Sequence, residues 1–204
     1  MAINIKLITA ATLISVAAVS CKGCKNILGC ESSYTFQLNS RVAPDKDTIS
    51  KGDTIWLEIN APVVFTDQQS GQQINYSNAS NLGTDMGFLK LINRSPTQMA
   101  DAVDSFDFVL SAGTEIGSPN PHLIKEYLIK QIGDRYLFKL GIIAKDTGTY
   151  GFNLGNPVNV EQDNKPCPKA DFNIIMVQTS QHYYLFPGGD TITSPSSNYW
   201  FHVR

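Results

Sequence analysis

The sequence is poor in charged and metal-binding side chains. Only 17% of its 204 residues are Asp, Glu, Lys or Arg, the formal net charge is −2, and there are three histidines and four cysteines. Nucleic-acid-binding domains usually carry a basic patch or stripe, so this composition argues against a nucleic-acid partner. The hydrophobic fraction of 42% is enough to bury a core, which indicates a folded domain and not a disordered chain.

Motifs of known catalytic sites are also missing. The sequence has no nucleophile elbow of the form Gly-x-Ser-x-Gly, no phosphate-binding loop and no His-Glu-x-x-His pair. The histidines are far apart, and the aspartates at 101, 104 and 107 are better explained as solvated surface carboxylates than as paired acids. We therefore expect no catalytic residues, no cofactor and no metal site, and an enzyme is the third of three functional hypotheses.

The only long apolar run lies at the N-terminus. The largely apolar stretch Leu7–Val19 follows Lys6 and is too short for a membrane-spanning helix, which needs about 20 apolar residues. Small residues, among them Ala18 and Ser20, come directly before Cys21. This pattern is typical of an export signal that is cleaved, and we assign residues 1–20 to it.

The stretch Ala18-Val19-Ser20-Cys21 resembles the lipobox of bacterial lipoproteins. The resemblance implies that the Cys21 sulfur is alkylated by diacylglycerol and that acyl chains hold the mature protein in a membrane, where two or more chains give stable attachment. In lipoproteins of diderm bacteria an aspartate after this cysteine favours the inner membrane. Lys22 stands there, which implies the outer membrane and leaves open whether the domain faces the periplasm or the surface. An ordinary signal peptide with an incidental cysteine is the alternative.

The remaining chain reads as a short tether, residues 21–30, and one domain, residues 31–204. Apolar runs separated by turn residues recur along this domain. In Asp53–Asn60 every second residue is apolar, which is the pattern of a strand with one buried face. Gly133-Asp134 lies between two such runs and indicates a hairpin.

About ten such strands are expected, with His182–Phe186 among them. The two long loops fall at residues 67–85 and 156–169. Many short strands at close spacing predict an all-β fold, an antiparallel β-sandwich with long loops.

The stretch Tyr136–Phe152 resembles the E-to-F corner of immunoglobulin-like domains. In that corner Asp-x-Gly-x-Tyr precedes an inward-facing residue, and here the tyrosine is Tyr150 and the inward residue is Phe152. The resemblance implies an immunoglobulin-like or related sandwich, in which the Tyr150 ring is buried and its hydroxyl bonds the nearby backbone. Antibody domains carry a disulfide cysteine where Phe152 stands, so that disulfide is missing.

Three cysteines are left once Cys21 is acylated, an odd number for an oxidising compartment. Cys30 comes just before the first expected strand, and Cys167 lies between two prolines ahead of a late strand. We predict a disulfide between Cys30 and Cys167, which would fasten the start of the domain to that strand. The competing pair, Cys24 and Cys30, would close a much shorter loop.

As a whole, the chain resembles small lipoproteins of Bacteroidetes-type bacteria: signal, cysteine, short tether and one sandwich. The resemblance implies a non-enzymatic, lipid-anchored lipoprotein of the cell envelope that binds an unidentified protein or glycan partner, or its own copies. The alternative is a carbohydrate-binding lipoprotein that stacks sugars on exposed aromatic side chains, unless these pack in the core. The candidate aromatics are Trp56, Trp200, Tyr183 and Tyr184. The tripeptide Asp-Thr-Ile, present three times, resembles the O-glycosylation acceptor of such bacteria and implies modification at Thr48, Thr54 and Thr191.

Overall fold

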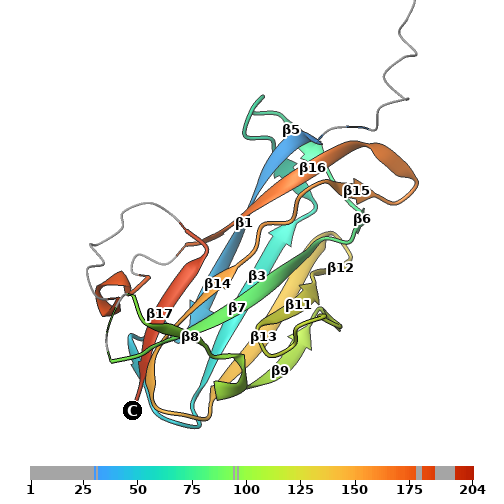
Figure 1. Ribbon diagram of the computed structural model, residues 1–204. Helices are drawn as coiled ribbons and strands as arrows, with labels where there is room; N and C mark the ends of the chain where they lie inside the picture. The colour runs from blue at the N-terminus through green and yellow to red at the C-terminus, as the bar shows by residue number, and fades with distance from the viewer. Residues whose placement is uncertain (1–29, 31, 94, 96, 178–180, 187–195) are drawn as a thin grey trace, which may run out of the picture. The chain divides into compact units, whose positions relative to one another are not determined.

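The computed structural model describes residues 30, 32–93, 95, 97–177, 181–186 and 196–204. Residues 32–204 belong to one compact unit built almost entirely of strands (Figure 1). The helices of the described chain are two short 3-10 turns, η3 (Val103–Ser105) and η4 (Tyr183–Leu185). Within the described residues, none of the helices has the length and apolar character to cross a membrane.

The larger sheet, sheet A, has eight strands in the order β12-β13-β3-β1-β16-β15-β6, with β9 also paired to β13. The bounds of these strands are β1 (Ser32–Ala43), β3 (Thr54–Pro62), β6 (Ala79–Ser80), β9 (Phe106–Ala112), β12 (Lys130–Ile132), β13 (Arg135–Ala144), β15 (Val160–Gln162) and β16 (Lys165–Met176).

The second sheet, sheet B, has seven strands in the order β10-β11-β7-β14-β17-β2, with β8 also paired to β7. Their bounds are β2 (Thr48–Ile49), β7 (Gly83–Leu91), β8 (Met99–Asp101), β10 (Thr114–Ile116), β11 (Ile124–Leu128), β14 (Gly148–Leu154) and β17 (Asn198–Val203). A separate hairpin pairs β4 (Val64–Thr66) with β5 (Gln73–Asn75).

The two sheets pack face to face through aromatic side chains. Phe106 of sheet A lies 5.0 Å from Phe88 and 4.9 Å from Tyr150 of sheet B, measured between ring centroids. Tyr127 of sheet B lies 5.4 Å from Phe138 of sheet A. These contacts between opposed sheets confirm the all-β sandwich that the strand pattern predicts.

Two strand pairs are parallel, which differs from the antiparallel sandwich expected from the sequence. β1 runs parallel to β16, with Phe36 opposite Phe172, and β17 runs parallel to β2. Parallel partners need long connections, so no local turn signal in the sequence reports them. The sheets are therefore mixed.

Of the local predictions, the hairpin is confirmed and one strand is wrong. Gly133 and Asp134 connect β12 to β13, whose residues pair antiparallel. The stretch His182–Phe186, expected to be a strand, contains the 3-10 turn η4. His182 has a φ of 54°, a left-handed backbone conformation that interrupts a strand just where the turn begins.

Cys30 and Cys167 are disulfide-bonded, as predicted. The parallel register explains the pairing, because Ser32 of β1 lies opposite Lys169 of β16. Each cysteine is two residues before one of these partners, so the register that aligns the strands also aligns the two cysteines. Cys24, the competing partner, lies outside the described residues.

The predicted corner is present around Tyr150. The ring of Tyr150 is fully buried, and its hydroxyl donates to the backbone oxygens of Asp146, at 3.2 Å, and Thr147, at 3.3 Å. These bonds tie the turn before β14 to the first inward-facing residue of that strand. The geometry matches what the immunoglobulin-like corner implies.

We predict that Tyr150→Phe lowers the free energy of unfolding by about 1–2 kcal/mol, because the substitution removes the two hydrogen bonds that the hydroxyl of this buried residue donates to the backbone. Urea denaturation of both proteins measures the difference. Tyr34→Phe is the matched control, since the half-buried Tyr34 hydroxyl has no hydrogen bond among the described residues. Equal effects of the two substitutions would contradict the corner's role.

Candidate functional site

The side of sheet A that faces away from sheet B, the sheet A outer face, carries an ordered set of polar side chains. Along β3 the residues alternate strictly: Ile55, Leu57 and Ile59 are buried in the core, whereas Trp56 and Glu58 lie half-buried on the outer face. Directly opposed residues of neighbouring strands share a face, so β1 and β13 extend this pattern sideways. The candidate site is built from these three strands.

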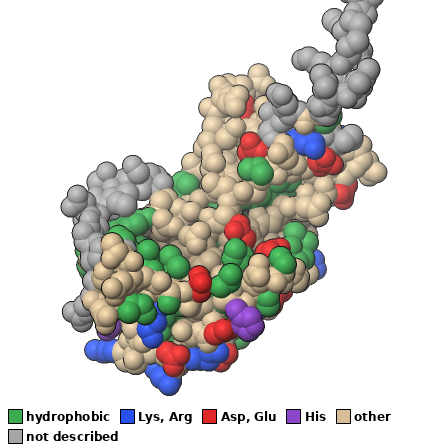
Figure 2. Space-filling view, in the orientation of Figure 1, with side chains coloured by type: hydrophobic (Ala, Val, Ile, Leu, Met, Phe, Trp, Pro, Cys, Tyr) green, Lys and Arg blue, Asp and Glu red, His purple; other side chains and the backbone are tan. Residues whose placement is uncertain are grey.

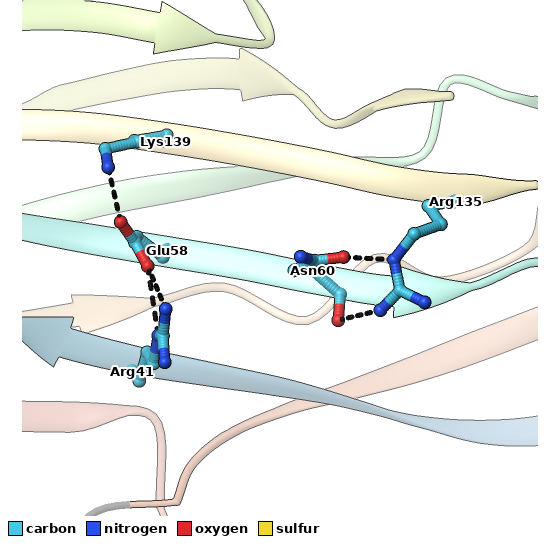
Figure 3. A network of polar contacts seen from close by, with 5 residues as sticks. All are labelled: Arg41, Glu58, Asn60, Arg135 and Lys139. Atoms are coloured by element: carbon cyan, nitrogen blue, oxygen red, sulfur yellow. Dashed lines mark hydrogen bonds and ion pairs between the residues drawn. The ribbon is translucent and has the colours of Figure 1, made fainter. Parts of the chain in front are cut away.

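Glu58 stands at the centre of a three-residue row across the sheet. It is opposite Arg41 of β1 and Lys139 of β13 in the strand register. Its carboxylate accepts from Arg41 Nη2 and from Lys139 Nζ, both at 2.6 Å (Figure 3). The hydrogen bond from Lys139, followed by that from Arg41, holds the pKa of the Glu58 carboxyl below its usual value.

A second polar pair lies beside this row. Arg135, at the start of β13, donates through Nε to the side-chain oxygen of Asn60 and through Nη2 to the Asn60 backbone oxygen, at 3.1 Å (Figure 3). Asn60 is two residues after Glu58 on β3, so both pairs are on the same face. The two bonds to Asn60 fix the plane of the Arg135 guanidinium group.

Trp56 lies on the same face, two residues before Glu58 on β3 and on the side away from Asn60. A side chain at Gly141, its opposite residue in β13, would come within 3.0 Å of the Trp56 ring, so the absence of a Cβ there makes room for the indole. Lys139 Nζ lies 5.1 Å from the ring centroid. Both the sheet and a cation therefore contact Trp56, which is half-buried and not an open stacking platform.

A groove of about 370 Å³ lies beside Asn60, between the outer face and the β4–β5 hairpin. All the polar side chains that line it are uncharged amides or hydroxyls, and the rest of the lining is apolar. The lining residues are Gln37, Asn39, Asn60, Ala61, Pro62, Val64, Phe65, Thr66 and Gln68.

The amides of this groove are ordered by one another. Gln37 donates to the side-chain oxygen of Asn39 at 2.7 Å, and Gln68 donates to the side-chain oxygen of Gln37 at 3.4 Å. Asn173 of β16 donates in turn to the side-chain oxygen of Gln68 at 3.2 Å. Neighbouring amides thus restrict one another before any ligand arrives, which lowers the entropic cost of binding.

Asp67 fastens the hairpin that forms one wall of the groove. Its buried carboxylate accepts from the Ser70 hydroxyl at 2.6 Å and from the backbone amides of Thr35 and Ser70, both at 2.9 Å. The Ser70 hydroxyl first, and the Thr35 amide next, lower the pKa of the Asp67 carboxyl to about 2. Since Thr35 belongs to β1, this carboxylate joins the hairpin to sheet A.

The four aromatics proposed for sugar stacking do not form one platform. Trp200 and Tyr183 are buried and pack with Leu91 in a small cluster of their own. Tyr184 is 53% exposed, and its hydroxyl donates to the Asp47 carboxylate. Trp56 is on sheet A, whereas Trp200 belongs to β17 of sheet B.

A cluster of titratable groups lies near η4. Asp45 accepts from the Tyr199 hydroxyl at 3.0 Å and lies 3.5 Å from Nε2 of the buried His182. Burial first, and the Asp45 charge next, raise the pKa of Tyr199, which keeps its hydroxyl a donor. These contacts hold loops together. Over the described part of the chain, no group of three or more His, Cys, Asp or Glu residues is placed to hold a metal ion.

The proposed modification sites are described only in part. Thr48 in β2 and Thr54 at the start of β3 are half-buried. Cys21 and Thr191 lie outside the described residues. Glycosylation and acylation therefore stay predictions.

The groove residues were not among the sites predicted from the sequence. Gln37 and Asn39 alternate with the buried Phe36 and Leu38, so the period-two pattern alone places both amides on one face. Their proximity to Asn60 and Gln68 depends on the strand register and the hairpin, which no local pattern reveals.

Comparison with known proteins assigns no family to the chain. No family model matches, and no curated protein matches. Among solved structures, the human F-spondin reeler domain is 11% identical with a TM-score of 0.40, covering 90% of this chain and 100% of that one. A type II cohesin dyad from the ScaA scaffoldin of Acetivibrio cellulolyticus is 10% identical with a TM-score of 0.32, covering 68% and 46%. A serine-rich repeat adhesion glycoprotein from Streptococcus agalactiae is 13% identical with a TM-score of 0.22, covering 66% and 44%.

We predict that Asp67→Asn loosens the β4–β5 hairpin while the sandwich stays folded. In the wild type, the low pKa means that the stabilisation by Asp67 is complete above the usual value of 3.8 and is lost as the pH falls through about 2. The Thr35 amide proton, observed by NMR, should report this titration near pH 2. The variant should lack it and show faster amide exchange at Thr35 and Ser70. A Thr35 signal that titrates identically in both proteins would contradict this role of Asp67.

Proposed function

We propose that the protein is a lipid-anchored, non-enzymatic lipoprotein of the bacterial cell envelope, and that its sandwich binds a glycan through the sheet A outer face. The observation that carries the proposal is the groove beside Asn60, with its pre-ordered amide side chains. Amides both donate and accept hydrogen bonds, as sugar hydroxyl groups do. Concave sites with a few fixed polar groups on an apolar lining are the usual form of small-ligand sites.

A protein partner is the second candidate, and a different groove favours it. This groove, of about 530 Å³, lies along β7, β10 and β11, and its lining includes Ile116, Ile124, Leu128 and Val158. Ile116 is 38% and Val158 64% exposed. Exposed apolar side chains that gather in one place are typical of protein-binding surfaces.

The anchor is inferred from the N-terminal segment. A short apolar run that ends in Ala18-Val19-Ser20-Cys21 supports export and acylation of Cys21. Lys22 supports placement in the outer membrane, by the resemblance to diderm lipoproteins. The likeness to Bacteroidetes-type lipoproteins rests on the same segment.

The tether keeps the domain near the membrane in this proposal. The disulfide fastens Cys30 to β16, so only the residues between Cys21 and Cys30 separate the acyl chains from the fold. Fully extended, a stretch of this length reaches roughly 30 Å. Ligands of such a protein would be components of the envelope or molecules that arrive at its surface.

We predict that Cys21→Ser abolishes lipid attachment, because serine has no thiol to alkylate. Metabolic labelling with palmitate should mark the wild type and not the variant, and only the wild type should partition into detergent. Cys24→Ser is the matched control and should label like the wild type. Absence of label from the wild type, or equal label in Cys21→Ser, would contradict the anchor.

We predict that the full-length protein in mild detergent binds a subset of an immobilised glycan array, and that Asn60→Ala removes this binding. Asn60 lines the groove and orients Arg135, and its side chain is exposed, so the fold should tolerate the change. Asn153→Ala is the control, since Asn153 is exposed on β14 of sheet B. No bound glycan, or binding that survives Asn60→Ala, would overturn the proposed glycan-binding function.

A further inference from the structure

Four cations lie together on one part of the sheet A outer face. The strands β12, β13, β3 and β1 contain five charged residues, and the register places all five on this face: Lys130, Arg135, Lys139, Arg41 and Glu58. On these four strands four cations and one carboxylate give a net charge of +3, although the whole chain has a net charge of −2. The remaining strands of sheet A add charges of both signs, among them Asp107, Asp171 and Lys169. In the view of Figure 2, by contrast, carboxylates and apolar side chains are interspersed over the middle of the sandwich, and lysines and arginines lie mainly along its lower edge.

Glu58 does not neutralise Arg135, the cation that contacts the groove residue Asn60. Glu58 is shared by Arg41 and Lys139. Arg135 makes no ion pair within the described part of the chain, and its side chain donates hydrogen bonds to Asn60. An oriented guanidinium group with donors to spare is well suited to a carboxylate, which it can bind through two parallel hydrogen bonds.

The amide of Asn60 adds a donor of known orientation. A guanidinium group can only donate, so the Asn60 atom that faces Arg135 Nε must be the oxygen, and the nitrogen lies on the other side of the amide. That nitrogen has no partner among the described residues. Asn39 is arranged alike, since its oxygen accepts from Gln37. The groove therefore offers the NH₂ groups of Asn39 and Asn60 as donors, which match acceptor oxygens of a ligand.

These observations indicate which chemical class of glycan the proposed site binds. The inference rests on the proposed glycan-binding function. We infer that the sheet A outer face binds an acidic glycan, with a uronate carboxylate at Arg135 and ring or hydroxyl oxygens at the amides of Asn39 and Asn60. Exposed apolar side chains of the groove, Pro62 and Val64, would contact the C–H surface of a sugar ring. Lys130, exposed beside Leu137 on the adjoining strand, would attract a neighbouring carboxylate of the same chain.

A nucleic acid fits this face less well. Single-stranded nucleic acids are held by aromatic side chains on which successive bases stack, together with a basic groove. The aromatic residue that lines this groove, Phe65, is buried, and Trp56 is covered by Lys139. Uncharged amides outnumber cations around the groove, which favours a hydroxyl-rich ligand.

The test uses a hexasaccharide of galacturonate and its fully methyl-esterified form, which has the same backbone without the charge. Hexasaccharides of alginate and hyaluronan extend the panel to other uronates. Binding to the full-length protein in mild detergent is measured by calorimetry at about 20 mM and about 300 mM salt, because added salt screens exposed charges. A thymidine oligonucleotide serves as the non-saccharide polyanion.

We predict that at least one uronate hexasaccharide binds, that removal of its charge weakens binding by roughly tenfold or more, and that high salt weakens it too. Arg135→Gln should weaken uronate binding by roughly tenfold. Lys51→Gln, which removes an exposed positive charge from the turn before β3, should leave it unchanged. Arg135→Lys should restore only part of the affinity, since lysine cannot bind a carboxylate through a planar pair of donors.

Three outcomes would overturn the inference. Equal affinity for the charged and esterified forms, with no effect of Arg135→Gln, would show a neutral-glycan site and leave the proposed function standing. Equal or tighter binding of the oligonucleotide would show a general polyanion surface. If no uronate binds, the inference that the ligand is an acidic glycan is wrong. If the neutral glycans of the array do not bind either, the proposed glycan-binding function is also wrong.

Discussion

The parallel pairing of β1 with β16 is the interaction on which the rest of the structure depends. It brings the first strand of the domain against a strand more than a hundred residues later, with Phe36 opposite Phe172. These two rings lie 5.3 Å apart and both contact Phe65, so the same register seats the base of the β4–β5 hairpin in the core. Burial of several aromatic rings is a large apolar contribution, and it offsets the entropy of closing so long a loop.

The same register positions the candidate site. It aligns Cys30 with Cys167, and it sets Thr35 where Asp67 can fasten the hairpin. With β3 on the other side of β1, the outward side chains of three strands meet in one polar array. The inner face of sheet A is thus committed to packing, while its outer face keeps charge and amide groups that the core does not need.

Local features of this structure could be predicted from the sequence, whereas the long-range strand pairings could not. The Cys30–Cys167 disulfide is a long-range contact that the cysteine count and positions did predict. The alternation in β3 identified which residues are buried, Gly133-Asp134 identified a hairpin, and the stretch before Tyr150 identified a corner, because each depends on residues close in the chain. The parallel pairs depend on distant strands. The segment at His182 looked like a strand because it is rich in aromatics, but its backbone turns there and Tyr183 packs with Trp200 in a buried cluster. The candidate aromatics form no single platform because Tyr183 and Trp200 are buried and Trp56 lies on the other sheet. The groove was missed because the proximity of its amides depends on the strand register and the hairpin.

In our proposal, the ligand binds on the sheet A outer face. The most direct measurement is an NMR titration of the side-chain amide signals of the full-length protein in detergent with a uronate hexasaccharide. We predict that the NH₂ signals of Asn39 and Asn60 and the Nε signal of Arg135 shift together and saturate together, while the signal of Asn153 on sheet B stays in place. Shifts confined to sheet B, or none at the three groove signals while binding is measured, would contradict it.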